Sequence, residues 1–155
     1  MGSPQITVGA VIEIDLKDGQ YAYGRILAGA DYGIYDFQAS QRIASVEEVI
    51  HRPFLFIVAV YNEAINSRRW VKIGKAPLVP ALPPHPLKFI QDALHPERFE
   101  LYEPLTGTII PALKHECKGL ERCSAWAPEQ VEARIRDHYA GRPNPTRERD
   151  LAVFD

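Results

Sequence analysis

The chain has 155 residues, of which 46% are hydrophobic and 25% are charged, and its formal net charge is -2. These values are typical of one soluble globular domain, and a chain of this length can form a hydrophobic core that needs no disulfide or metal. The small net charge argues against a nucleic-acid-binding protein, because phosphate binding usually needs a basic domain or a concentrated basic stripe.

The beginning of the chain lacks the basic region and the apolar run of a signal peptide. The apolar stretch from Phe54 to Tyr61 is far shorter than the ~20 residues that cross a bilayer. We therefore expect a cytoplasmic protein with no membrane span. In that compartment the two cysteines, Cys117 and Cys123, are expected to be reduced thiols.

Short β-rich runs separated by glycines predict antiparallel strands near residues 9–15, 20–28 and 32–37. The Asp18-Gly19 pair predicts the turn of the first hairpin. Gly24 lies inside a strand pattern, where a glycine usually permits a bulge, a sharp bend or a close backbone approach. This pattern favours a curled sheet.

A capping-box spacing that begins at Ser45 predicts a short helix over residues 46–50, which Pro53 ends. The run from Phe54 to Tyr61 is apolar on both faces and predicts a strand in the core. Another short strand is predicted at residues 70–74. An extended arm that packs across the domain is predicted from five prolines: Pro77, Pro80, Pro83, Pro84 and Pro86.

Further short strands are predicted at residues 89–90, 99–102 and 108–110, with one more between Leu120 and Trp126. Trp70 and Trp126 each adjoin an apolar run. We therefore interpret both tryptophans as core residues in preference to exposed interface anchors.

The clearest helix begins at Pro128 and ends at Gly141. Residues 142–155 form a tail that is mobile unless its last apolar residues dock. The predicted fold is a single α+β domain over residues 1–155, with a strongly bent, mainly antiparallel β-sheet that could be barrel-like, a short helix and a C-terminal helix. One apolar stripe of that last helix carries Val131, Ile135 and Tyr139.

Neither the phosphate-binding P-loop spacing nor the dinucleotide-binding glycine pattern occurs, so nucleotide binding by those routes is excluded. His115, Cys117, Cys123 and His138 lack the paired spacing of zinc ligands, so we expect no metal and no cofactor. A cysteine nucleophile with a histidine base stays an alternative. No sequence context supports it, and we predict no catalytic residue.

Several segments occur in an order that resembles the immunity protein 26 family. They are Gly-Ala-Val-Ile-Glu-Ile at 9–14, Asp-Gly-Gln-Tyr-Ala-Tyr-Gly-Arg-Ile-Leu at 18–27, Arg-Trp-Val-Lys-Ile-Gly at 69–74, Glu-Cys-Lys-Gly-Leu-Glu at 116–121 with Trp126, and the helix at 128–138. The resemblance covers the chain from about Val8 to Asn144. Among these segments we expect four structural residues: Gly24, Trp70, Gly74 and Trp126.

This resemblance implies a bacterial immunity protein of a polymorphic or contact-dependent toxin system, which binds and neutralises a cognate protein toxin and is not an enzyme. Two residues depart from the family pattern. Ala127 stands where the family often has an acidic residue that would cap the last helix, and Lys118 replaces a usual acidic neighbour.

An acidic and aromatic surface is our hypothesis for the toxin-binding site, because many bacterial toxins act on phosphate-bearing substrates and so present basic clefts. Carboxylates beside tyrosine rings would give such a partner fast electrostatic association and buried anchors. A solvated hairpin edge explains the same residues equally well. They are Asp31, Tyr32, Tyr35 and Asp36, with Glu47 and Glu48 nearby.

Two other functions stay open at this point. One is a curled-sheet module that binds nucleic acid or a peptide, and the other is a small enzyme that uses Cys117 or Cys123. The contacts of such a binding module would be Arg25, Arg68, Arg69 and Lys72.

Overall fold

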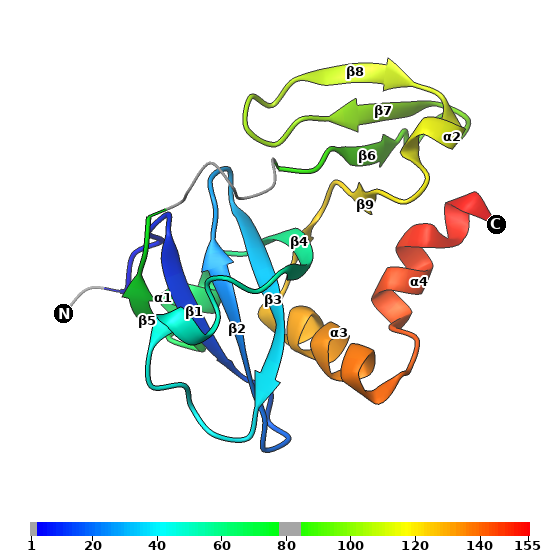
Figure 1. Ribbon diagram of the computed structural model, residues 1–155. Coiled ribbons are helices and arrows are strands. Elements are labelled where there is room, and N and C mark those ends of the chain that lie inside the picture. The colour runs from blue at the N-terminus through cyan, green and yellow to red at the C-terminus, as the bar shows by residue number, and fades with distance from the viewer. Residues whose placement is uncertain (1–2, 78–84) are drawn as a thin grey trace.

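The computed structural model describes residues 3–77 and 85–155. This part of the chain forms two β-sheets with helices packed against them (Figure 1). The larger sheet has six strands in the order β10-β4-β3-β2-β1-β5. These are β1 (Ala10–Asp15), β2 (Tyr21–Ile26), β3 (Asp31–Ala39), β4 (Phe54–Val60), β5 (Trp70–Lys75) and β10 (Ala125–Trp126). The predicted strands at 9–15, 20–28, 32–37, 54–61 and 70–74 are confirmed within a few residues at each end.

Three irregularities bend the larger sheet, since the register shifts once between β1 and β5, once between β2 and β3, and once between β3 and β4. The shift between β2 and β3 falls between Ala22 and Gly24. A Cβ atom at Gly24 would lie 2.9 Å from the carbonyl oxygen of Gly33, so the two backbones approach closely there.

The larger sheet stays open, and the barrel-like shape suggested above is wrong. Its two edge strands, β10 and β5, lie at opposite ends of the strand order, and β10 pairs with β4 over Ala59 and Val60 alone. A strand of two residues leaves most of the β4 edge without a neighbouring strand.

Each face of the larger sheet carries its own hydrophobic cluster. On one face, Val131 and Ile135 of α3 (Pro128–Ala140) pack against the apolar side chains of β1 to β4 together with Trp70 and Trp126. The other face is covered by the segment around the 3-10 helix η1 (Val46–Glu48), whose capping box at Ser45 is confirmed. The predicted helix at 46–50 is therefore shorter and more tightly wound than expected.

Helix α3 begins at Pro128 and ends at Gly141, which has a φ of 71° as a left-handed C-cap. Ala127 offers no side-chain acceptor for the first turn, as its residue type implies. The backbone N–H of Ala127 instead donates to Oε1 of Gln130 at 2.9 Å, so half of a capping box is retained.

The smaller sheet has the order β8-β7-β6-β9 and lies above the larger one in Figure 1. Its strands are β6 (Lys88–Gln91), β7 (Phe99–Tyr102), β8 (Ile109–Ala112) and β9 (Glu121–Arg122). The stretch from Leu120 to Trp126 thus holds two short strands where one was predicted. Since β9 pairs with β6 and β10 pairs with β4, this stretch links the two sheets.

The C-terminal tail is helical and docks on the smaller sheet. After α3 the chain forms α4 (Pro145–Leu151) and the 3-10 helix η2 (Ala152–Phe154), and α4 runs toward the smaller sheet in Figure 1. The ring of Phe154 lies edge-on to Phe89, with 5.1 Å between centroids. The last apolar residues of the tail therefore pack against the smaller sheet.

Two further helices were not predicted, α1 (Glu63–Asn66) and α2 (Lys114–Cys117). Of the predicted proline arm, Pro77 is exposed and Pro86 is partly buried. Pro80, Pro83 and Pro84 lie outside the described residues.

Candidate functional site

The six residues predicted to form the binding surface separate into two groups. Asp31, Tyr32 and Tyr35 have 0%, 0% and 1% of their surface exposed. Tyr32 packs in the cluster on the α3 face of the larger sheet, Tyr35 packs in the cluster on the η1 face, and Asp31 contacts the smaller sheet. These three side chains cannot meet a partner while the fold is intact. The other three are exposed: Asp36, Glu47 and Glu48.

Asp31 forms a buried ionic contact between the two sheets. Its carboxylate accepts a hydrogen bond from Nζ of Lys88 at 2.7 Å and lies 2.9 Å from Nδ1 of His85. Lys88 is only 3% exposed and lies in β6. The pair therefore holds β3 of the larger sheet against the first strand of the smaller one.

The two buried tyrosines pack in the hydrophobic clusters of the larger sheet. The ring of Tyr32 lies edge-on to Trp70 with 5.8 Å between centroids, and burial raises the pKa of its phenol to about 12. The hydroxyl of Tyr35 accepts a hydrogen bond from Nη1 of Arg25 at 3.1 Å.

Arg25 is an interior residue and not a surface contact for nucleic acid. It is 2% exposed, and its guanidinium donates to the carbonyl oxygens of Gly9, Ala76 and Pro77 as well as to Tyr35. These bonds join β2 to the residue just before β1 and to the two residues just after β5. Lys72 donates to Gln5 and Thr7, so its ammonium group also has internal partners.

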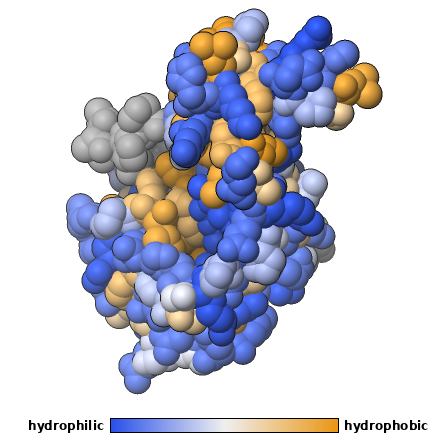
Figure 2. All heavy atoms as spheres, turned by 90° about the vertical axis from the view of Figure 1, so that its right-hand side faces the viewer, coloured by the Kyte–Doolittle hydropathy of each residue, from blue (hydrophilic) through white to orange (hydrophobic). Residues whose placement is uncertain are grey.

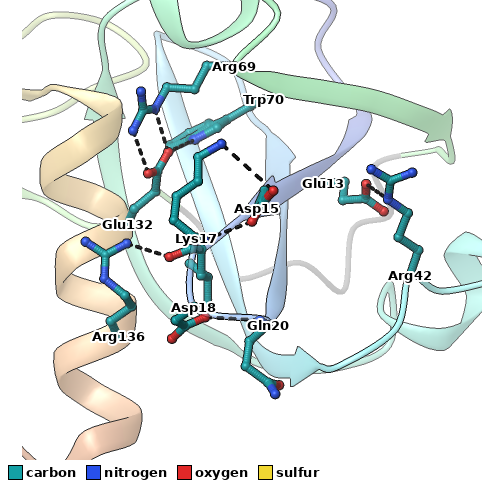
Figure 3. A network of polar contacts seen from close by, with 11 residues as sticks. Glu13, Asp15, Lys17, Asp18, Gln20, Arg42, Arg69, Trp70, Glu132 and Arg136 are labelled. Atoms are coloured by element: carbon teal, nitrogen blue, oxygen red, sulfur yellow. Dashed lines mark hydrogen bonds and ion pairs between the residues drawn. The ribbon is translucent and has the colours of Figure 1, made fainter.

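A second buried carboxylate, Glu132 of α3, ties that helix to the sheet edge. It accepts hydrogen bonds from Nε and Nη2 of Arg69, both at 2.8 Å, and from the indole N–H of Trp70 at 2.9 Å. Figure 3 shows the three side chains pointing toward one another. The carboxylate also raises the pKa of the Arg69 guanidinium, chiefly through its hydrogen bonds. One turn later Arg136 donates to the carbonyl oxygen of Leu16 at 2.8 Å.

Sequence reasoning missed the role of Glu132, although a signal was present. The buried positions of α3 are 128, 131, 132 and 135, which is the spacing of one helix face. A carboxylate on the apolar face of a helix needs a buried partner, and that requirement could have identified Glu132.

The two cysteines do not have the properties of a reactive nucleophile. Both are free thiols, and Cys117 is buried. Burial raises the pKa of each thiol, which lowers the fraction of reactive thiolate. Within residues 3–77 and 85–155, no three His, Cys, Asp or Glu side chains are grouped so that they could hold a metal ion.

The exposed acidic residues lie on both sides of the larger sheet near the start of β4, with Asp36 on the side of α3 and with Glu47 and Glu48 in η1 on the other face. Asp36 accepts a hydrogen bond from the Tyr139 hydroxyl at 2.8 Å, and its backbone N–H donates to the carbonyl oxygen of Pro53. Glu47 lies 3.2 Å from Nε2 of His51. Glu48 accepts hydrogen bonds from the backbone of Ala44 and Ser45, so it stabilises its own turn.

A cleft of about 850 Å³ begins at the segment from Ile50 to Pro53, which follows Glu47 and Glu48 in the chain. Figure 2 views the molecule from the side of α4 and shows apolar side chains in a hollow between the lower body and the upper sheet. The floor is formed by the first half of β4, and the other walls come from both sheets, α3 and α4. The lining residues used below are Phe54, Leu55, Phe56, Ile57, Leu87, Leu120, Glu121, Arg134 and Arg147.

Comparison with known proteins identifies the family. The model of the family described as immunity protein 26 matches residues 7–100, which include β1 to β6 and the beginning of β7. No curated protein and no solved structure matches the chain. In the described part of the chain, every helix is too short or too polar to cross a membrane. The family match extends over more than half of the sequence and agrees with the resemblance carried by the segments at 9–14, 18–27 and 69–74, so the chain belongs to the immunity protein 26 family.

Proposed function

We propose that this protein is a bacterial immunity protein that binds the cognate toxin of a polymorphic or contact-dependent toxin system and neutralises it in the cytoplasm of the producing cell. The observation that carries the proposal is the family match over residues 7–100. A neutralising partner acts by binding, and the raised thiol pKa values of Cys117 and Cys123 support a role that needs no cysteine nucleophile.

The exposed acidic residues Asp36, Glu47 and Glu48 are proposed as part of the toxin-binding surface. Their charge would attract a basic substrate cleft on the toxin and speed association, and salt would weaken this effect. Asp31, Tyr32 and Tyr35 are buried and are not part of this proposed surface.

The function is tested with the protein encoded by the adjacent upstream gene. We expect that protein to stop growth when it is expressed alone, and co-expression of the immunity protein to restore growth. The two purified proteins are expected to form a complex that persists at moderate salt. If growth is not restored and no complex forms, the proposed function is wrong.

The acidic surface is tested separately by the double variant Asp36→Lys with Glu47→Lys, both at exposed positions. The association rate at low salt is expected to fall by about tenfold or more, and the difference should shrink at moderate salt. Glu97→Lys is the matched control, because Glu97 is an exposed acidic residue beside the smaller sheet. Unchanged association of the double variant would remove this surface from the interface.

A nucleic-acid-binding module is less well supported. Of its proposed contacts, Arg25 is buried and Arg69 is paired with Glu132, so these two do not present free charge to phosphates. A salt titration separates the two functions, because nucleic-acid affinity would fall steeply with salt concentration.

A further inference from the structure

The outer edge of β4 is covered by a neighbouring strand over only two of its seven residues. On that side β10 pairs with Ala59 and Val60, and the pairing ends there. The unpaired part from Phe54 to Ile57 forms the floor of the 850 Å³ cleft. A sheet edge that opens into a cleft is a template for one more strand.

The direction of the backbone groups can be derived from the neighbouring hydrogen bonds. The N–H of Val60 donates to Ala30 on the β3 side at 3.3 Å, whereas the N–H of Tyr61 donates to Trp126 on the β10 side at 3.0 Å. The register between β3 and β4 is regular from Phe56 to Ala59. Since backbone groups alternate along a strand, the N–H and C=O of Ile57 point to the β10 side, beyond the end of β10 and into the cleft.

The walls of the cleft combine apolar side chains with an excess of positive charge. Leu87, which is 40% exposed, stands on the wall nearest the smaller sheet. Beside Leu87, where Glu121 of β9 pairs with Lys88 of β6, two guanidinium groups share one carboxylate. Arg134 donates to both oxygens of Glu121 at 3.0 and 2.9 Å, and Nη1 of Arg147 lies 3.3 Å from Oε1.

Two cations on one carboxylate leave a net charge of +1. The Nη1 atom of Arg147 is also buried and lacks a partner in hydrogen-bond geometry within the described part of the chain. A carboxylate that entered the cleft would lie near the two guanidinium groups and neutralise the excess charge.

We propose that an extended segment of the cognate toxin binds in this cleft as an added strand beside Phe54 to Ile57, with an apolar side chain against Leu87 and a carboxylate at Arg147. This inference rests on the proposed function, since it names the part of the protein that the toxin occupies. Backbone hydrogen bonds to Ile57 supply affinity, and the apolar wall and the arginine select the segment.

The edge of the smaller sheet is a weaker template for the same purpose. Its outer strand β8 exposes Ile109 and Ile110 at 48% and 51%. The strand also contains Pro111, which has no N–H to donate to an added strand. The open part of β4, from Phe54 to Ile57, therefore offers the better edge.

Amide hydrogen exchange tests the added strand directly. In the complex with the protein of the adjacent upstream gene, exchange at the amide of Ile57 is expected to slow by about tenfold or more. The amide of Tyr61 is the internal control, because it already donates to Trp126 and should change little. An unchanged rate at Ile57 in a complex that forms normally overturns the inference and leaves the proposed function intact.

Two variants test the walls, each with a matched control. Leu87→Asp and Arg147→Glu are expected to raise the Kd for the toxin by about tenfold or more each. Leu94→Asp changes a leucine that is 86% exposed outside the cleft, and Arg149→Glu changes an exposed arginine on the same helix α4. Both controls should keep the wild-type Kd, and circular dichroism establishes that all four variants are folded.

The remaining outcomes are also decisive. Wild-type affinity in folded Leu87→Asp and Arg147→Glu proteins overturns the cleft as the toxin site, while growth protection by the wild type still supports the proposed function. If these variants abolish self-association of the protein and leave toxin affinity unchanged, the cleft binds a second copy and the inference is wrong. If the wild type neither binds nor protects, both proposals fall together.

Discussion

Replacing Trp70 with alanine is expected to destabilise the protein severely, because this side chain joins three parts of the structure. It is 1% exposed, its ring lies edge-on to Tyr32 in the main core, and its indole N–H donates to Glu132 of α3 at 2.9 Å. Truncating a tryptophan in a core costs about 3–5 kcal/mol, out of a typical total stability of about 5–15 kcal/mol. For a chain of this size the melting temperature should fall by roughly 6–20 °C.

A second variant separates the hydrogen bond from the packing. Trp70→Phe keeps an aromatic ring but removes the donor to the buried carboxylate, and it is expected to cost about 1.5–3 kcal/mol. Glu132 keeps its two bonds from Arg69 in that variant. Combining Trp70→Phe with Glu132→Gln in a double-mutant cycle measures how strongly the indole and the carboxylate are coupled.

Urea unfolding followed by circular dichroism is the assay, since it does not depend on tryptophan fluorescence. The matched control is Val71→Ala on the same strand, where the side chain is 50% exposed and the change should stay within about 0.5 kcal/mol. If Trp70→Ala also stays within that range, the packing and hydrogen-bond argument is refuted, and Trp70 would have to act in binding.

Three further predictions concern the interior of the larger sheet. Asp31→Asn should lower the unfolding free energy by about 3–5 kcal/mol, because Nζ of Lys88 would stay buried without its opposite charge, and an unchanged urea midpoint would contradict this. Gly24→Ala should lower the unfolding free energy by about 1–3 kcal/mol, since the added Cβ would lie 2.9 Å from a carbonyl oxygen of β3. An unaltered melting temperature would contradict this, because it would mean that β2 and β3 move apart without cost. Burial raises the pKa of Tyr23 and of Tyr32 to about 12. Above pH 10 the unfolded chain therefore releases phenol protons that the folded chain keeps. The free energy of unfolding should fall by about 1.4 kcal/mol per pH unit for each tyrosine as the pH rises from 10 to 12. Urea unfolding across that pH range, with phenolate absorbance followed in parallel, is the measurement, and a flat stability profile would refute the assignment.

Local patterns were sufficient for the elements whose signals lie within a few neighbouring residues. The alternation and glycine turns before residue 40 predict β1 to β3, and the capping box at Ser45 marks η1. The proline at 128 and the glycine at 141 bound α3 as expected. Helices α1 and α2 were missed because each has four residues, which is too short to show a helical repeat.

The candidate site was less predictable, because burial depends on contacts between distant positions. Asp31, Tyr32 and Tyr35 follow a glycine turn and have the composition of an exposed hairpin. The hydrophobic clusters on the two faces of the sheet nevertheless bury the tyrosines, and Lys88 neutralises the carboxylate from 57 residues away. The cleft likewise needs β4, the β9 region and α4 together, and no single segment shows it.

The sequence by itself determined the order of the strands along the chain, the last helix and the family, since these depend on side-chain periodicity, turn residues and segments that are read in chain order. The tertiary structure alone decided which strands stand at the sheet edges. There the two-residue strands β9 and β10 join different sheets and leave most of the outer edge of β4 open. It also decided that Asp31, Glu132 and Arg25 are interior residues. The physical reason is that a charged side chain has the same local pattern whether it faces water or a buried partner, and only long-range packing brings that partner within hydrogen-bond distance.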